Sequence, residues 1–321
     1  MLLPTAPTWP QLASLLPAAA IAAPDPTALT LHRERNGWCV RSATIWLALE
    51  VKGVPYATVR EMGSSAPALH WPDATVQTDS VAVLRTLDAA LPSTTPLWPP
   101  AGVEARAVDE MVAAFAATMP SARESDRAAY LFCPEEGSLY EPLPRSSFIA
   151  TLDATEGLLG RHGGGAFFCG PSFSAADAVW APVLERYAAQ LPLLHDGLRP
   201  RDAGRYPHLS RWYDAMESQI PAYGCRVRGD ASSWSKVLNQ AGHGNAGGVP
   251  EICPDGDTAA RDAAASARGA ETWTAYAADR PWVAPSPEEE AAATILRRHD
   301  AIRDDAARRG VLGGNADAIS A

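Results

Sequence analysis

The chain has 321 residues, a formal net charge of −10 and 47% hydrophobic residues, enough apolar material for the cores of about two domains. Glycine and proline contribute 24 and 28 residues, but the large hydrophobic fraction excludes a disordered or fibrous protein. Only Lys52 and Lys236 are lysines, and the arginines form no long basic run. This charge pattern argues against nucleic acid or anionic membranes as partners.

The cysteines and the first residues indicate the compartment. Five cysteines are scattered without a close pair, which is typical of a reducing environment rather than of a disulfide framework. Residues 1–31 contain no Lys or Arg and Pro17 interrupts their apolar stretch, unlike a signal or transit peptide. No run reaches the roughly 18 to 20 apolar residues of a membrane span. We therefore expect a cytoplasmic protein, with organellar targeting left open as the alternative.

Strand and helix patterns alternate after an N-terminal extension at residues 1–28. Residues 29–33 alternate apolar and polar side chains as a half-buried strand does, and residues 55–61 form a second strand candidate. Between them a helix is predicted from Cys39 to Lys52, ending at Gly53. Because apolar residues surround most of its wheel, this helix should be buried between two layers.

A predicted hairpin at residues 66–77 and a helix at 83–91 complete the order β-α-β-β-β-α. This order predicts a small α/β domain over residues 29–91. A proline-rich linker at residues 92–100 follows it, and only helical patterns follow the linker.

The rest of the chain is predicted to be helical. Patterned stretches at residues 103–118, 145–161, 174–190 and 207–219 predict an all-α domain over residues 101–223. Residues 224–321 are predicted to form a C-terminal extension with helices. These include the alanine-rich stretch at 258–278 and one last helix that starts at Ser286, where an N-cap serine precedes a proline and three glutamates.

Cys39 is the strongest candidate for chemistry. It stands between a predicted strand and the start of a buried helix, where unpaired backbone N–H groups and the helix dipole stabilise a thiolate, with Arg41 nearby. A thiolate attacks a disulfide sulfur or an electrophilic carbon. The alternative is a small hydrophobic side chain that fills a helix start.

Several segments resemble cytosolic glutathione transferases of the cysteine type, which include the omega and lambda classes and the dehydroascorbate reductases. The resemblance covers residues 29–223 and implies a thioredoxin-like domain followed by an all-helical domain. The segments run from Cys39 to Tyr56, from Ala66 to Leu69, from Thr78 to Ser80, and over the helical half at Phe173–Ala178 and Tyr206–Trp212.

The resemblance implies roles for individual residues. Cys39 is implied as the catalytic thiol, and Ala66, next to a cis-proline at Pro67, as the backbone partner of the cysteinyl part of glutathione. Asp79 and Ser80 are implied to hold its γ-glutamyl end. The alternatives are an edge-strand trans-proline at Pro67 and plain N-capping by Asp79 and Ser80. Ser174 and Asp177 form a capping box, which is a structural role.

Three departures from the family pattern are visible in the sequence. Val40 replaces the usual proline after the cysteine, and Ser42 stands where dithiol relatives carry a second cysteine. Only residues 62–66 separate the second strand from Pro67, where relatives insert a helix. Because a serine cannot resolve a mixed disulfide, the chemistry is predicted to be monothiol.

The sequence thus predicts a glutathione-dependent thiol transferase or reductase in redox metabolism or detoxification. Glutathione is its expected co-substrate, and its partner is a small electrophilic, oxidised or glutathionylated compound. No metal is expected, and the resemblance implies a homodimer. The alternatives are a transferase that conjugates glutathione to electrophiles and a non-catalytic binding module with the same fold.

Overall fold

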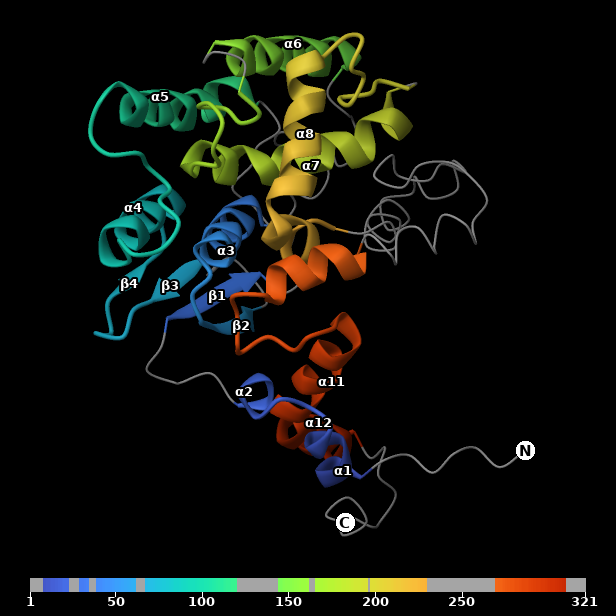
Figure 1. The fold of residues 1–321 in the computed structure, drawn as a ribbon. Helices are drawn as coiled ribbons and strands as arrows, with labels where there is room; N and C mark the ends of the chain where they lie inside the picture. The colour runs from blue at the N-terminus through green and yellow to red at the C-terminus, as the bar shows by residue number, and fades with distance from the viewer. Residues whose placement is uncertain are drawn as a thin grey trace. The chain divides into compact units, whose positions relative to one another are not determined.

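A computed structural model describes residues 8–22, 29–34, 39–61, 67–119, 144–161, 165–195, 197–229 and 269–309. The chain divides into two compact units. The larger unit is Pro26–Ala267, and the smaller one combines Met1–Asp25 with Arg268–Ala321. Figure 1 shows the elements of both.

A four-stranded sheet in the order β2-β1-β3-β4 forms one layer of the larger unit. Strand β1 (Thr30–Glu34) pairs in parallel with β2 (Ala57–Glu61) and antiparallel with β3 (Ala68–His70). Strand β4 (Val76–Gln77) continues the sheet antiparallel to β3. The predicted strands are therefore confirmed. The start of the predicted hairpin, at Ala66, lies outside the described residues.

Helix α3 (Val40–Lys52) is the central helix of this unit, and α4 (Ser80–Ala90) packs beside it. Helix α3 contacts β1 and also α7 (Ala175–Leu194), the long helix of the all-α domain. It therefore lies between two layers, as predicted (Figure 1). It ends at Gly53, whose φ of 62° is in the left-handed region that glycine adopts most readily.

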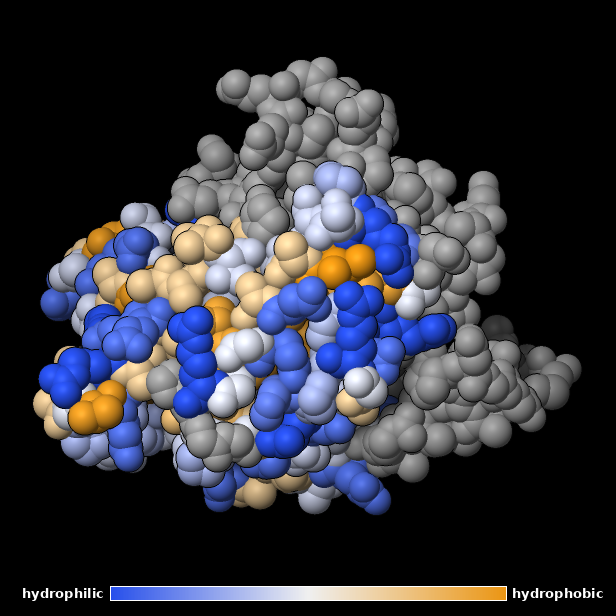
Figure 2. All heavy atoms as spheres, turned by 90° about the horizontal axis from the view of Figure 1, so that it is seen from above, coloured by the Kyte–Doolittle hydropathy of each residue, from blue (hydrophilic) through white to orange (hydrophobic). Residues whose placement is uncertain are grey.

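The all-α domain consists of the predicted helices. They are α5 (Val103–Thr118), α6 (Arg145–Gly160), α7 (Ala175–Leu194) and α8 (Pro207–Gln219). A short π-helix, η2 (Tyr223–Val227), follows α8 and packs against both α8 and α3. Among the coloured residues in Figure 2, hydrophobic ones form small patches between hydrophilic ones on the face seen from above.

The start of α7 is fixed by the predicted capping box. The backbone N–H and the hydroxyl of Ser174 both donate to Asp177 Oδ2, each over 2.9 Å. Asp177 also accepts hydrogen bonds from Phe168 N and Trp212 Nε1, at 3.1 and 2.9 Å. Burial raises the pKa of Asp177, and these hydrogen bonds oppose the increase. The structural role predicted for Ser174 and Asp177 is confirmed.

The linker at residues 92–100, which joins the α/β domain to the all-α domain within the larger unit, is held by hydrogen bonds. Lys52, with a fully buried side chain, donates to Asp88 Oδ1 at 2.9 Å and to Thr94 Oγ1 at 3.0 Å. Asp88 in turn accepts from the backbone N–H groups of Leu97 and Trp98, at 2.8 and 3.0 Å. One carboxylate thus holds the end of α3, α4 and the linker together.

The smaller unit is helical and draws on both ends of the sequence. It contains α1 (Trp9–Ser14), α2 (Ala18–Ile21), a helix at 269–277, α11 (Pro287–Arg297) and α12 (His299–Arg308). Helix α11 packs against α1 and α2 around Ala20, Ala284 and Ala293. The two segments that the sequence presents as separate extensions thus contribute to one compact unit. Residues 258–268 of the alanine-rich stretch lie outside the described residues.

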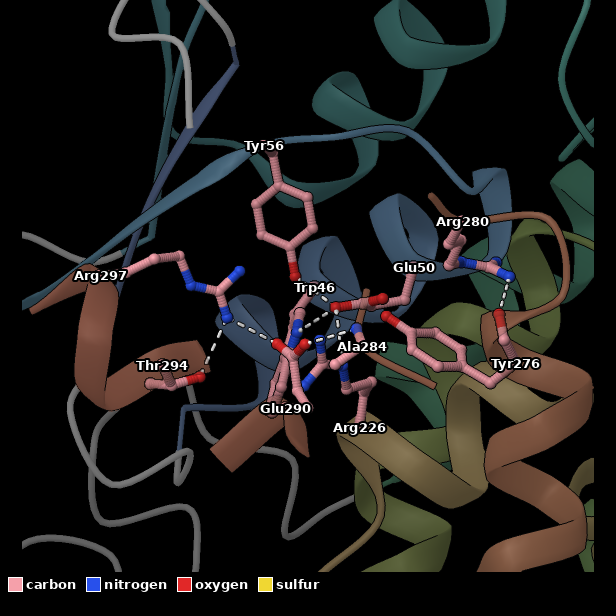
Figure 3. Close-up of polar contacts among 10 residues, drawn as sticks. All are labelled: Trp46, Glu50, Tyr56, Arg226, Tyr276, Arg280, Ala284, Glu290, Thr294 and Arg297. Atoms are coloured by element: carbon pink, nitrogen blue, oxygen red, sulfur yellow. Dashed lines mark hydrogen bonds and ion pairs between the residues drawn. The ribbon is translucent and has the colours of Figure 1, made fainter. Parts of the chain in front are cut away.

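Glu290 is the main polar contact of the smaller unit (Figure 3). It accepts from Ala284 N at 3.0 Å and from Arg297 at 2.7 Å, and Arg297 also donates to Thr294 Oγ1 at 3.0 Å. Ser286 caps α11 as predicted, since its hydroxyl accepts from Glu289 N at 3.2 Å. The prediction of one continuous final helix is wrong, because Arg298, at φ −115° and ψ 8°, separates α11 from α12.

None of the helices among the described residues combines the length and the apolar character needed to cross a membrane.

Candidate functional site

Cys39 is the N-cap of α3. Its backbone is extended, with φ −74° and ψ 116°, and its carbonyl accepts the first helical hydrogen bond, from Ala43 N at 2.9 Å. Its Sγ accepts a hydrogen bond from Ser42 N at 3.5 Å. The sulfur therefore occupies the position in which a capping side chain meets the unpaired N–H groups of the first turn, where negative charge is favoured.

The cysteine is held in the packed interior of the domain. Cys39 is only 3% exposed, and Val40, Ala43 and Ile45 behind it are buried in the core. The sequence prediction of a cysteine at a strand-to-helix junction is thus correct in position.

Pro67 and Cys39 lie at the same end of the sheet, where β1 ends and β3 begins. Pro67 is buried and immediately precedes β3. Because β3 runs antiparallel to β1, with Ala68 opposite His32, the start of β3 lies at the end of β1 from which the chain continues to Cys39. Ala66, the other residue predicted from this segment, lies outside the described residues.

Asp79 and Ser80 follow β4 at the same end of the sheet. Strand β4 runs antiparallel to β3, with Gln77 opposite Leu69, so its end lies beside the start of β3. Asp79 is the exposed N-cap of α4 and accepts from Ala82 N at 2.7 Å; Ser80 is half-buried in the first turn. The N-capping alternative for Asp79 is present in the structure. Its carboxylate and the amides of the first turn suit a zwitterionic ligand end.

The described parts of the site therefore fit a glutathione-like peptide in their chemistry. The topology brings an N-cap thiol, the residue that precedes the interior strand β3 and an acid-serine pair to the same end of the sheet. Among the described residues there is no cluster of three or more His, Cys, Asp or Glu that could hold a metal ion.

A buried charged cluster, which sequence reasoning missed, accompanies the start of α3. Arg186 of α7 is 3% exposed. Burial lowers the pKa of its guanidinium. Groups that carry negative charge when ionised oppose that decrease, in the order Glu185, Cys39, Tyr223 and Glu34. Burial raises the pKa of Tyr223, and the negative charge of Glu185 raises it further. The available signal was the Glu185–Arg186 pair inside a helix that is otherwise mostly apolar.

Ser42 has a defined partner. Its hydroxyl is buried and accepts from Glu34 N at 3.5 Å, which connects the first turn of α3 to the end of β1. Ser42 thus helps to position the strand-to-helix junction.

Cys169 provides a contrast with Cys39. Burial raises the pKa of the Cys169 thiol to about 12, and the negative charges of Asp177 and Glu110 add to the increase. This thiol is therefore protonated at neutral pH and chemically inert.

Glu50 connects α3 to the elements around it (Figure 3). Its Oε1 accepts from Tyr56 OH at 2.6 Å and from Trp46 Nε1 at 3.2 Å, and lies 4.0 Å from Arg226 Nε of η2. Arg33 of β1 stacks over the Trp46 ring at 4.1 Å. These contacts fix the orientation of α3, and hence of its N-cap.

The comparisons agree with this architecture. Residues 144–215 match the family model of the glutathione S-transferase C-terminal domain. A search of curated protein sequences found no match.

Three solved structures illustrate the likeness. Glutathione transferase Omega 3C from Trametes versicolor is 18% identical with a TM-score of 0.52, over 74% of this chain and 98% of that one. The Tau class enzyme of mango is 15% identical with a TM-score of 0.51, over 68% and 100%. A trimeric glutathione transferase of Leishmania is 16% identical with a TM-score of 0.54, over 67% of this chain but only 49% of that one. The fold predicted from sequence is thereby confirmed.

Proposed function

We propose that this chain, with the glutathione transferase fold and a matching C-terminal domain segment, is a glutathione-dependent thiol transferase of the cysteine type. The observation that carries the proposal is the position of Cys39 as the N-cap of α3, at the end of the sheet where Pro67 and Asp79 also lie. Such an N-cap thiol supplies the thiolate that disulfide exchange requires.

The reaction follows from a single thiol. The Cys39 thiolate attacks the glutathionyl sulfur of a mixed disulfide, forms a Cys39–glutathione disulfide and releases the substrate as a thiolate. A second glutathione, as thiolate, then attacks the glutathionyl sulfur and leaves as oxidised glutathione, which regenerates the Cys39 thiolate. Ser42 takes no part in the exchange, because a hydroxyl cannot replace the second thiol.

The binding roles complete the proposal. Pro67 and the preceding Ala66 provide an extended backbone that pairs with the cysteinyl part of glutathione, and Asp79 with Ser80 holds its γ-glutamyl end. The second substrate is a small oxidised, electrophilic or glutathionylated compound. The assembly implied by the resemblance is a homodimer, although the Leishmania relative is described as trimeric.

The test is turnover of a small glutathionyl mixed disulfide by the purified protein with reduced glutathione, measured as oxidised glutathione formed. We expect Cys39→Ala to reduce turnover at least about a hundredfold, because the nucleophile is removed. Cys225→Ala, which changes another cysteine that forms no disulfide, serves as the matched control and should retain turnover. Activity that survives in Cys39→Ala contradicts the thiol mechanism.

Intact mass provides a second measurement. After treatment with oxidised glutathione, the wild type should gain a glutathionyl group at Cys39. An adduct at another cysteine would refute the site assignment. Absence of turnover together with no retention on immobilised glutathione would instead favour a non-catalytic module.

A further inference from the structure

His32 and His70 form a ring stack on the sheet of the larger unit. Their ring centroids are 4.1 Å apart and the ring planes are inclined by 18°. His32 belongs to β1 and His70 to β3, and the register places His32 opposite Ala68 and His70 opposite Thr30. The two histidines are therefore diagonal neighbours on one face of the sheet, a separation that aromatic side chains bridge.

The stack lies on the face of the sheet that points away from the core. Leu31 and Leu69, the sequence neighbours of the two histidines, are opposite each other and fully buried in the core. Since successive side chains of a strand point to opposite faces, His32 and His70 point the other way. Both are half-buried, and Val59, opposite His32 on β2, is 40% exposed. A small ion from solvent thus has access to the stack.

The separation of the rings suits two ligands of one metal ion. Imidazole nitrogen is the commonest protein ligand of transition metals and suits nickel, copper and zinc. A metal–nitrogen bond is about 2.0–2.1 Å long, so two nitrogens on one ion lie within about 4.2 Å of each other. The ring centroids meet this limit. Because the rings are nearly parallel, each must turn about its Cβ–Cγ bond to aim a nitrogen at a shared ion, and that torsion is broad for histidine.

The other described histidines are placed differently. His195 is buried against Phe148, with ring centroids 4.9 Å apart, and His299 contacts the Trp9 ring at 5.6 Å. No other two histidine rings are in contact within the described ranges. In the same part of the chain no third His, Cys, Asp or Glu joins His32 and His70 as a ligand group. Water must therefore complete the coordination of an ion held by this pair.

We propose that His32 and His70 form a two-imidazole site for a divalent transition-metal ion of the nickel, copper or zinc class. The ion links β1 to β3, and water fills its other coordination positions. The site uses none of the residues assigned to glutathione, so the proposal does not rest on the proposed function. Its structural effect is on the pairing of the two strands that lead to Cys39 and away from Pro67.

The test is calorimetric titration of the full chain, made without a histidine tag and freed of metal by a chelator, with Ni²⁺ at neutral pH. Ni²⁺ is the probe because zinc also binds the thiolates of the chain. We expect His70→Phe to bind Ni²⁺ about tenfold or more weakly than the wild type, because one of two protein ligands is lost. Phenylalanine keeps an aromatic ring against His32, so the variant separates the nitrogen ligand from ring packing.

His299→Phe is the matched control. It removes a histidine that has a carboxylate oxygen of Asp300 at 3.2 Å from its Nε2, so it reports adventitious binding at a surface imidazole. Its affinity for Ni²⁺ should stay within about twofold of the wild type, since both proposed ligands remain. Wild-type affinity in folded His70→Phe overturns the proposal, and so does a larger loss in His299→Phe.

A measurement on the wild type decides the matter if His70→Phe does not fold. Diethyl pyrocarbonate acylates imidazole nitrogens, and peptide mass mapping gives its rate at each histidine. Ni²⁺ should slow the modification of His32 and His70 together by about fivefold or more, because a metal-bound nitrogen is no longer nucleophilic, and leave His299 unchanged. Protection of neither residue, or of one alone, refutes a shared ion.

Discussion

At the scale of single residues, Ser42 shows how closely position and chemistry are connected at the start of α3. Its backbone N–H donates to Cys39 Sγ and its hydroxyl accepts from Glu34 N, each over 3.5 Å. One residue thus contacts the proposed nucleophile through its backbone and the end of β1 through its side chain. A cysteine at position 42 would stand one helical turn from Cys39, the spacing of dithiol redox motifs.

Ser42→Cys is therefore expected to convert the site from monothiol to dithiol. On oxidation the variant should lose two hydrogens in intact mass and show a peptide linked between positions 39 and 42. The lost hydrogen bond to Glu34 N should cost about 1 kcal/mol of unfolding free energy. Ser42→Ala, which loses the same hydrogen bond without gaining a thiol, is the control. A variant whose thiols stay separate after oxidation would show that the two positions do not face each other.

At the scale of elements, the Lys52–Asp88 pair joins α3, α4 and the linker. Burial alone would raise the pKa of Asp88, but hydrogen bonds from Leu97 N, Lys52 and Trp98 N outweigh burial and lower it from its ordinary value of 3.8. The ionised carboxylate is thus favoured in the folded state more than in the unfolded one.

This shift makes stability depend on pH with a definite sign. Because the unfolded chain binds the proton more tightly, the contribution of Asp88 is present above pH 3.8 and is lost as the pH falls through the lower folded pKa. Asp88→Asn should cost about 3 kcal/mol at pH 7, since it leaves the buried Lys52 ammonium unpaired. Urea unfolding of both proteins from pH 7 to pH 3 should show the difference narrowing only at the acid end. A constant difference would contradict this assignment.

The elements that the sequence predicts well are those with local signals. Alternating residues indicate β1, and Gly53 marks the end of α3 because glycine adopts the left-handed conformation found there most readily. Helix α1 carries such a signal too, a capping box of Thr8 and Gln11. The charged cluster around Arg186 could not be foreseen, because it depends on how α7 packs against α3.

At the scale of the whole molecule, the chain consists of two units of unequal core. The larger unit buries many aromatic residues such as Trp180 and Trp212, whereas the smaller one buries Trp273, Tyr276 and Val283 and a separate cluster of Ala20, Ala284 and Ala293 with Leu16 and Ile21 beside it. Burial of the few atoms of this alanine cluster supplies little hydrophobic free energy to the contact between α2 and α11. The smaller unit therefore relies on α1 and α2 to cover α11.

Removal of residues 1–25 is expected to loosen the other half of this unit. Without α2, Ala293 of α11 loses its cover, so amide hydrogen exchange in residues 287–308 should accelerate about tenfold or more. Exchange in α3 and α7, whose contacts belong to the larger unit, should stay within about twofold. Hydrogen exchange followed by mass spectrometry measures both regions in one experiment. Unchanged protection of α11 would show that the N-terminal helices do not support it.

The pairing of α2 with α11 also sets an order of events during protein synthesis. The partners are separated by more than 260 residues, from Ile21 to Pro287, and at about 5–20 residues per second a ribosome needs on the order of tens of seconds to bridge them. Throughout that interval Ala20 and Ile21 have left the ribosome without their helical partner. A segment made well before its partner is thus among the last to find its place, and it gives a nascent-chain chaperone a long time to bind.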